Sequence, residues 1–172
     1  MTFLPLANAV LATALAIIPV KAASAADAIT GRATVIDGDT IEIRGKRIRL
    51  QGVDAPESWQ HCGDGDGGTY RCGKEAAAAL DRFLSSSRPT RCEILERDRY
   101  DRSVSVCFRA DGREVNQWLV QGGHAVDWGK YSKGAYADVQ ELARSRGAGI
   151  WRGDFDLPCQ ARAKHTRREP SC

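Results

Sequence analysis

Two short acidic segments contain the carboxylates that could take part in chemistry. In VIDGDTIEI, Asp37-Gly38 is a hairpin-turn signal between two β-branched halves, and Asp39 is a second aspartate that such a turn does not need. In VDAPE, Asp54 follows a strand-like segment, and a proline-fixed turn separates it from Glu57. A structural explanation, a turn followed by a helix-capping acid, fits an isolated DxxE pattern better than a functional one. This acidic corner therefore needs support from other residues.

Arginines in two places are candidate partners for an anion. The segment RDRYDR, residues 97–102, is a highly charged turn, and Arg49 lies in a strand-like segment just before VDAPE. A planar guanidinium can bind two phosphate oxygens at once, so an arginine cluster favours phosphate recognition. The alternative is a solvated loop and a solvated strand arginine. Taken alone, neither set of arginines decides between these interpretations.

The sequence argues against two common kinds of metal site. The stretch DGDG at residues 64–67 begins like a calcium loop, but Gly68 stands where a ligand should be and Thr69 replaces the invariant glycine of an EF-hand. The chain has no CxxC pair and only three histidines, which disfavours zinc. We interpret DGDG as part of a flexible loop bracketed by cysteines.

The first 25 residues have the pattern of a secretory signal peptide. An apolar run, LANAVLATALAIIPV, precedes small residues with an Ala-x-Ala site, although no lysine or arginine stands before the run. An uncleaved membrane anchor is the alternative. Cleavage after Ala25 would leave about 147 residues, enough for one domain, with a net charge of about +2 that does not indicate a strongly basic nucleic-acid binder. We expect a secreted or periplasmic protein without stable membrane association after cleavage.

Six cysteines, all beyond the predicted signal peptide, indicate an oxidising compartment. They could pair in 15 ways, but their spacing favours pairs that are close in sequence. Cys62 and Cys72 bracket the glycine-rich loop, and Cys92 and Cys107 lie on strand-like segments that flank the RDRYDR turn. The predicted disulfides are Cys62–Cys72, Cys92–Cys107 and Cys159–Cys172, and the last would tether the tail.

The hydrophobic pattern predicts a small α+β domain with a partly closed antiparallel barrel. Three short strands are expected within residues 32–53, and a strand pair at residues 91–96 and 103–110. Helices are expected at residues 74–86, 113–121 and 134–146. The basic tail, residues 154–172, is either a flap tethered by its disulfide or disordered.

Four motifs in order, IDGDT, RIRL, VDAPE and RYDR, resemble those of the staphylococcal nuclease (thermonuclease) family. The resemblance extends from about Gly31 to Trp151, with supporting matches at GKEAAAAL, ADGREVNQWLVQGG and the closing GIW. It implies a disulfide-stapled OB-fold-type five-stranded β-barrel with three α-helices, in a domain that spans residues 26–153. It also implies one Ca²⁺ ion and hydrolysis of DNA and RNA phosphodiester bonds that leaves 3′-phosphate ends.

The resemblance assigns metal and base roles to the acidic segments. The family's two aspartate ligands of calcium correspond to Asp39 and Asp54, and the backbone carbonyl ligand corresponds to Ala55, where the family often has threonine. Two carboxylates and a carbonyl suit the flexible oxygen shell of calcium and leave positions for water and a phosphate oxygen. Glu57 corresponds to the candidate general base.

The resemblance also assigns the basic residues. The two family arginines that contact the phosphoryl group correspond to Arg49 and Arg102. A basic–aromatic pair that contacts the terminal phosphate of a nucleotide corresponds to Arg99 and Tyr100. Together with the acidic residues, this set implies charge neutralisation, activation of water and binding of a phosphodiester at one site.

Two features depart from the family pattern. The loop after Glu57 is longer and carries two cysteines, and the family's base-stacking tyrosines have no clean match, Trp128 and Tyr131 being the nearest candidates. An alternative function is a catalytically inactive nuclease-fold module that binds nucleic acid or protein, but such modules usually lose the carboxylates or arginines that this chain retains. A disulfide-stapled carbohydrate- or protein-binding barrel explains the cysteines but not the charged residues. We expect a monomeric enzyme.

Overall fold

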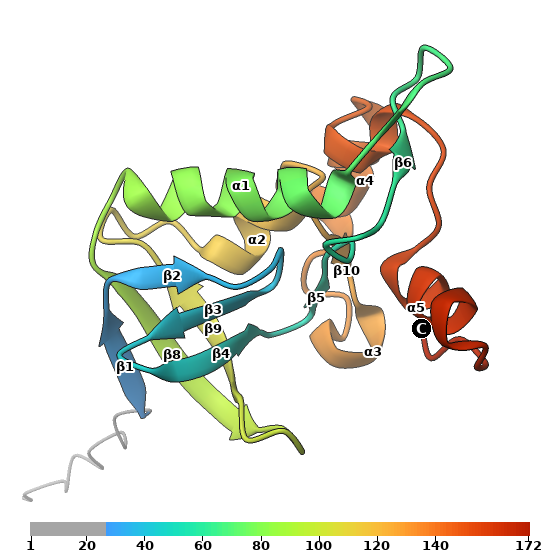
Figure 1. Ribbon diagram of the computed structural model, residues 1–172. Coiled ribbons are helices and arrows are strands. Elements are labelled where there is room, and N and C mark those ends of the chain that lie inside the picture. The colour runs from blue at the N-terminus through green and yellow to red at the C-terminus, as the bar shows by residue number, and fades with distance from the viewer. Residues whose placement is uncertain (1–26) are drawn as a thin grey trace, which may run out of the picture.

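A curved sheet forms the body of the protein (Figure 1). The computed structural model describes residues 27–172, so the predicted signal peptide, residues 1–25, lies outside the described residues. The six strands pair in the order β1-β8-β9-β4-β3-β2. Their bounds are β1 (Ala28–Gly31), β2 (Ala33–Val35), β3 (Thr40–Ile43), β4 (Lys46–Leu50), β8 (Thr90–Arg97) and β9 (Ser103–Phe108).

The sheet closes on itself because one stretch of chain supplies both of its edges. Only Arg32 separates β1 from β2, yet β1 pairs with β8 and β2 pairs with β3, both in antiparallel register. β1 and β2 therefore act as one bent strand. Counted in this way, the barrel has the five-stranded form that the family resemblance implies, and the fold is α+β as expected. The prediction of an antiparallel barrel is wrong for one pair, because β4 and β9 run parallel.

Local turn chemistry sets the two hairpins that lead to the site. β2 and β3 pair around the Asp37-Gly38 turn, with Val35 opposite Ile41. β3 and β4 pair around Arg44 and Gly45, which both have positive φ, at 52° and 72°. Such a pair of left-handed residues matches the right-handed twist of a two-residue hairpin. Both turns lie where the sequence predicts them.

Two short strand pairs attach the loops to the body. β5 (Val53–Asp54) pairs with β10 (Val126–Asp127), so Asp54 lies opposite Val126. β6 (Cys62–Gly63) pairs with β7 (Thr69–Tyr70) and forms the neck of the glycine-rich loop. The β5–β10 pair joins the acidic corner to the helical part of the chain.

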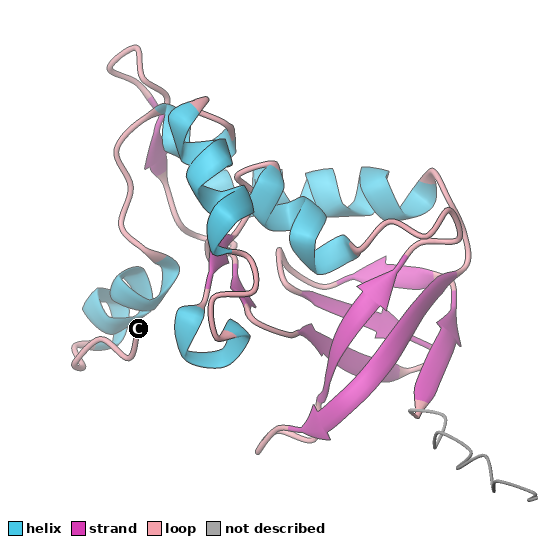
Figure 2. Cartoon of the chain, turned by 180° about the vertical axis from the view of Figure 1, so that it is seen from behind, coloured by secondary structure: helices cyan, strands magenta, loops and turns pink. Residues whose placement is uncertain are grey.

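Helices cover one side of the barrel, and one helix stands apart from the others (Figure 2). They are α1 (Cys72–Ser85), α2 (Val115–Gln121), α3 (Gly129–Ser132), α4 (Ala137–Ser145) and α5 (Pro158–Thr166), with a 3₁₀ helix η1 (Gly149–Arg152). The sequence predicts α1, α2 and α4 but neither α3 nor α5. No helix within residues 27–172 is long and apolar enough to cross a membrane.

The main core lies between the barrel and the helices. Alternate residues of β3 and β4 point inward, and the apolar face of α1 covers them, as the period of each element requires. The largest fully buried apolar side chains of this cluster are Ile41, Ile43, Ile48, Leu50, Leu80 and Leu119. This core supports the strand ends from which the acidic residues extend.

A buried asparagine connects α2 to the barrel near the site. The side-chain amide of Asn116 donates to the carbonyls of Gln51 (2.9 Å) and Ser105 (3.2 Å), and its oxygen accepts the N–H of Cys107 at 3.1 Å. Asn116 is fully buried, so these bonds satisfy a group that would otherwise be costly to bury. They hold the turn after β4 in place, directly before the acidic corner.

The six cysteines form three disulfides: Cys62–Cys72, Cys92–Cys107 and Cys159–Cys172. The pairing is the one that the sequence spacing predicts. Cys92 and Cys107 lie directly opposite each other in the β8–β9 register, and both are fully buried. This disulfide therefore links two strands of the barrel, whereas Cys159–Cys172 closes the tail.

Replacing Cys92 and Cys107 with alanine should lower the free energy of unfolding by roughly 3 kcal/mol, because the bond closes a loop of 15 residues in the unfolded chain. Urea unfolding followed by circular dichroism would measure the change. A Cys159→Ala, Cys172→Ala variant is the matched control, since its disulfide lies outside the barrel and its loss should lower the midpoint by much less. An unchanged midpoint for the Cys92 and Cys107 variant would contradict the prediction.

Candidate active site

The turn before β3 presents Asp39 to the acidic corner. The carboxylate of Asp37 accepts the N–H of Asp39 at 3.1 Å, so Asp37 is used in shaping the turn. A Cβ atom on Gly38 would lie 2.6 Å from the Cβ of Ala55, so only glycine allows the turn to approach VDAPE this closely. The close approach sets Asp39 against the main chain of the acidic corner.

Asp39 is a nearly buried carboxylate with three partners. Its Oδ2 accepts the N–H of Ala55 at 2.9 Å, its Oδ1 accepts the hydroxyl of Thr40 at 3.3 Å, and Arg49 forms an ion pair with it. Asp39 is only 7% exposed, so its charge needs this compensation. The main-chain bond links the two acidic segments that the sequence predicts to act together.

Arg49 is the shared counter-ion of the two aspartates. Antiparallel pairing of β3 and β4 places it opposite Thr40, next to Asp39. Its Nη2 donates to the carbonyl of Val53 at 3.1 Å and lies 3.5 Å from Oδ1 of Asp54. Burial lowers the pKa of Arg49 to about 10, and the charge of Asp54 opposes this shift. Arg49 therefore stays protonated at neutral pH, and its guanidinium is already paired with the two aspartates.

Close packing against α1 holds the main chain of Glu57. A Cβ atom on Gly73, at the start of α1, would collide with the Glu57 carbonyl oxygen, so glycine is required there. The N–H of Glu57 donates to Oε1 of Gln60 at 3.2 Å, and the N–H of Gln60 donates to the Glu57 carbonyl at 2.8 Å. The Glu57 side chain remains 31% exposed, which leaves it accessible to water.

Arg162 on α5 enters the acidic corner, and the sequence analysis missed it. Its Nη1 and Nη2 donate to the two oxygens of Asp54 at 2.8 and 2.9 Å, and Nη1 also donates to Glu57 at 2.9 Å. Burial by itself would lower the pKa of Arg162, but the hydrogen bonds and charges of Asp54 and Glu57 outweigh it and raise that pKa. The only sequence feature that pointed to this residue was a tail rich in arginine with a predicted disulfide.

The charged turn between β8 and β9 is separate from the acidic corner. Arg102 donates from Nε to Oδ2 of Asp98 at 2.7 Å, and the main-chain N–H groups of Tyr100 and Arg102 donate to Oδ1. Burial would raise the pKa of Asp98, but the hydrogen bonds from Arg102 and Tyr100 outweigh it and lower that pKa. Tyr100 is 65% exposed, and the Arg99 guanidinium lies 4.9 Å from its ring centroid.

Strand register nevertheless directs Arg102 toward the same side as Arg49. β4 and β9 are parallel, with Arg49 opposite Val104, so the position two residues before Val104 continues the same face. The charge of Arg102 also contributes to the lowered pKa of Arg49. Among residues 27–172, the terminal nitrogens of Arg102 have no hydrogen-bond partner, so they are open to an anion.

Trp128 lies close to both arginines of the acidic corner. The guanidinium carbons of Arg49 and Arg162 are 5.7 and 5.5 Å from its ring centroid. Tyr131 meets the same ring edge-on, with the centroids 4.5 Å apart, and is itself 43% exposed. Trp128 therefore packs against the cations of the site, while Tyr131 has a ring surface open to solvent.

The site joins residues that are far apart in sequence. Asp39, Arg49, Asp54, Ala55 and Glu57 meet at one place, and Arg162 joins them from the tail. Arg99, Tyr100 and Arg102 form a second group at the β8–β9 turn. Within residues 27–172, no group of three or more acidic, histidine or cysteine side chains is arranged to hold a metal ion. A cation here would need main-chain oxygen and water as well.

Comparisons with known proteins show the family to which the chain belongs. A family model described as "Staphylococcal nuclease homologue" matches residues 47–153. "Succinoglycan biosynthesis protein ExoI" of Rhizobium meliloti (strain 1021) is 59% identical over 150 residues, which cover 87% of this chain and 78% of that protein. An "Uncharacterized endonuclease" of Escherichia coli O157:H7 is 32% identical over 129 residues, covering 72% of this chain and 77% of that protein. The chain therefore belongs to the staphylococcal nuclease homologue family.

Proposed function

We propose that this chain is an exported, calcium-dependent nuclease that hydrolyses DNA and RNA phosphodiester bonds and leaves 3′-phosphate ends. The observation that carries the proposal is the meeting of the buried Asp39 and Asp54 at Arg49, with Glu57 joined to Asp54 through Arg162. Family membership and the similar protein named an endonuclease support a nuclease. The name of the Rhizobium meliloti relative states no reaction, so it does not favour a second function.

The residues fit a calcium ion. Asp39 and Asp54 are hard oxygen ligands, and the carbonyl of Ala55 is the main-chain oxygen that family membership adds to them. The acidic corner already accommodates a cation, since the guanidinium of Arg162 bonds both oxygens of Asp54. When bound, calcium would neutralise phosphodiester charge and polarise the phosphoryl group.

The protein side chains then have separate tasks. Glu57 accepts a proton from the attacking water at a carboxylate oxygen. The oxygen of that water bonds to phosphorus as the bond between phosphorus and the 5′ oxygen breaks. The 5′ oxygen takes a proton from solvent water, and the phosphate stays on the 3′ oxygen. Arg102 donates hydrogen bonds to the non-bridging oxygens, where charge increases in the transition state. Arg49 can do so only when its pair with Asp39 opens, so we assign the main contact to Arg102.

Exposed side chains support the proposed binding of substrate, and the disulfides support the proposed export. Arg99 and the exposed ring of Tyr100 are suited to a terminal phosphate and its nucleoside, and Tyr131 offers a second ring for stacking. Three disulfides support an oxidising compartment, and with the apolar N-terminal segment they favour a secreted or periplasmic protein, which we propose to be a monomer. Residues 26–153 would form the nuclease domain, followed by the tail at 154–172.

Hydrolysis should require calcium, and magnesium should replace it poorly, because magnesium needs a stricter octahedral shell and retains its water. The test uses the oxidised protein without its first 25 residues, with single-stranded DNA, duplex DNA and RNA. Each substrate is incubated with calcium, with magnesium or with excess calcium chelator. Chain cleavage is read on gels, and the product ends are identified by their resistance to a 3′-end-dependent exonuclease before and after phosphatase treatment.

An Asp54→Asn variant is the negative control, because it keeps the shape of the ligand but removes its charge. It should lose calcium-dependent cleavage of all three substrates. Full activity in excess chelator would show that the calcium assignment is wrong. Absence of cleavage in every condition, with the fold intact, would favour the inactive binding module instead.

A further inference from the structure

α5 carries a cation into the acidic corner from outside the barrel. The guanidinium of Arg162 makes three hydrogen bonds of 2.8–2.9 Å, two to Asp54 and one to Glu57. Asp54 has a side chain that is only 1% exposed, and Arg162 engages both of its oxygens. A metal ligand and a candidate general base are therefore covered by the same side chain.

The buried charge of Asp54 requires a cation at this position. Without Arg162, its remaining cationic partner would be Arg49, at 3.5 Å. A buried carboxylate without a close partner is strongly unfavourable, so without Arg162 the acidic corner would favour binding of a proton or of another cation. A calcium ion would bind the oxygens that Arg162 uses, and its charge would repel the guanidinium, so the two would compete for Asp54.

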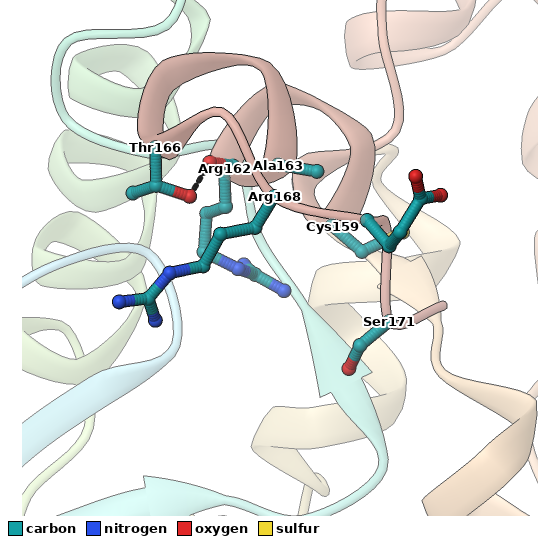
Figure 3. Close-up of a pocket in the computed structure, with 7 residues that line it drawn as sticks. Cys159, Arg162, Ala163, Thr166, Arg168 and Ser171 are labelled. Carbon is teal, nitrogen blue, oxygen red and sulfur yellow. Dashed lines mark hydrogen bonds between the residues drawn. The ribbon is translucent and has the colours of Figure 1, made fainter.

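None of the residues of α5 belongs to the hydrophobic core clusters of the described chain, so displacement of the helix would not break core packing. The helix lies apart from the other helices (Figure 2), and the side chains of Arg162 on α5 and Arg168 in the segment after it are shown in Figure 3. It contacts the body through side chains, since His165 stacks on the partly exposed ring of Trp59 with the centroids 4.5 Å apart. In the preceding linker, the carbonyl of Asp156 accepts a hydrogen bond from Gln60 at 2.7 Å.

The tail disulfide constrains α5 and the residues that follow it. Cys159 and Cys172 close a loop that contains Arg162, and the hydroxyl of Thr166 donates to the Arg162 carbonyl at 2.8 Å (Figure 3). The loop therefore presents Arg162 from a constrained helix, which lowers the entropy cost of placing it in the acidic corner.

We propose that α5 is an autoinhibitory strap whose Arg162 competes with calcium for Asp54 and Glu57. The inference rests on the proposed function, because it needs a calcium site at these carboxylates. Calcium binding has to displace the guanidinium, and displacement also releases Glu57 for its reaction with water. The strap thus couples the arrival of the metal to exposure of the general base.

The test measures calcium affinity by titration calorimetry in the oxidised protein, independently of activity. Arg162→Gln should bind calcium at least about tenfold more tightly than the parent, since charge-assisted hydrogen bonds no longer have to be broken. Arg162→Lys keeps the charge but loses the bidentate contact with Asp54. Its calcium affinity should lie between those of the parent and Arg162→Gln. Arg168→Gln is the matched control, because it removes the same charge from an exposed residue of the same tail, and its affinity should equal that of the parent.

Thermal unfolding provides a second measurement. Without calcium, Arg162→Gln should melt at a lower temperature than the parent, and calcium should raise its melting temperature by more, because the ion replaces the missing cation. Equal calcium affinity in the parent and Arg162→Gln would overturn the strap and leave the calcium site intact. Failure of every variant to bind calcium would overturn the site as well. A loss of turnover by Arg162→Gln at saturating calcium would show that Arg162 serves the phosphate instead.

Discussion

Replacing Glu57 with glutamine should slow hydrolysis about 10²–10⁴-fold at saturating calcium, the usual effect of losing a general base. The amide keeps the size of the side chain and can still accept a hydrogen bond from Arg162, but it cannot take a proton from water. The main chain at this position is held by Gln60 and by close packing on Gly73, so the fold should be unaffected. Single-turnover rates with a labelled oligonucleotide would measure the effect.

Glu75→Gln is the matched control for this variant. Glu75 is a partly exposed glutamate on α1 that pairs with Arg152 at 3.1 Å. The substitution removes the same charge, and the rate should stay close to that of the parent. A Glu57→Gln enzyme with the parent rate and an unchanged circular dichroism spectrum would show that Glu57 is not the base.

Replacing Arg102 with alanine should reduce turnover roughly 10²–10³-fold, by analogy with the loss of one donor to a developing oxyanion. Its side chain is 28% exposed and pairs with Asp98. The main-chain N–H groups of Tyr100 and Arg102 would still donate to Asp98, so the turn should keep its shape. Because a partly exposed ion pair contributes little, the free energy of unfolding should change by about 1 kcal/mol or less.

Arg97→Ala separates this effect from a general loss of positive charge. Arg97 lies in the same hairpin and pairs with Asp101 at 2.8 Å, but its side chain is 53% exposed. Cleavage rates for Arg97→Ala should stay within a few-fold of the parent, as expected for a rim charge whose effect is screened by salt. If the two variants lose equal activity, the hairpin attracts nucleic acid as a whole and Arg102 has no special part in the reaction.

Ground-state binding distinguishes the two catalytic roles. Glu57→Gln should bind a nucleoside 3′,5′-bisphosphate with nearly the parent affinity, because Glu57 acts on water. Arg102→Ala should bind it more weakly, because the guanidinium contacts the phosphate before the reaction begins. Calorimetry on both variants would therefore show whether the acidic corner and the hairpin turn contribute to different steps.

The elements closest to the site could be predicted because their causes are local. Asp37 and Gly38 form a turn through one side-chain bond and the absence of a Cβ atom, and Arg44-Gly45 forms the next turn through left-handed backbone angles. Alternating side chains set Cys92 opposite Cys107 across one hairpin. Turn preference and strand period depend on a few neighbouring residues, so the hairpins, the disulfide pairs and three of the helices follow from the sequence alone.

The closing of the barrel and the full composition of the site depend on tertiary structure. β1 meets β8 only because the chain bends at Arg32, and local patterns contain no signal for that pairing. Arg162 reaches Asp54 across 108 residues, from a helix whose polar, basic sequence shows no apolar face. Its place is set by the path of the chain, the tail disulfide and the need of a buried carboxylate for a counter-ion, which are properties of the folded molecule as a whole.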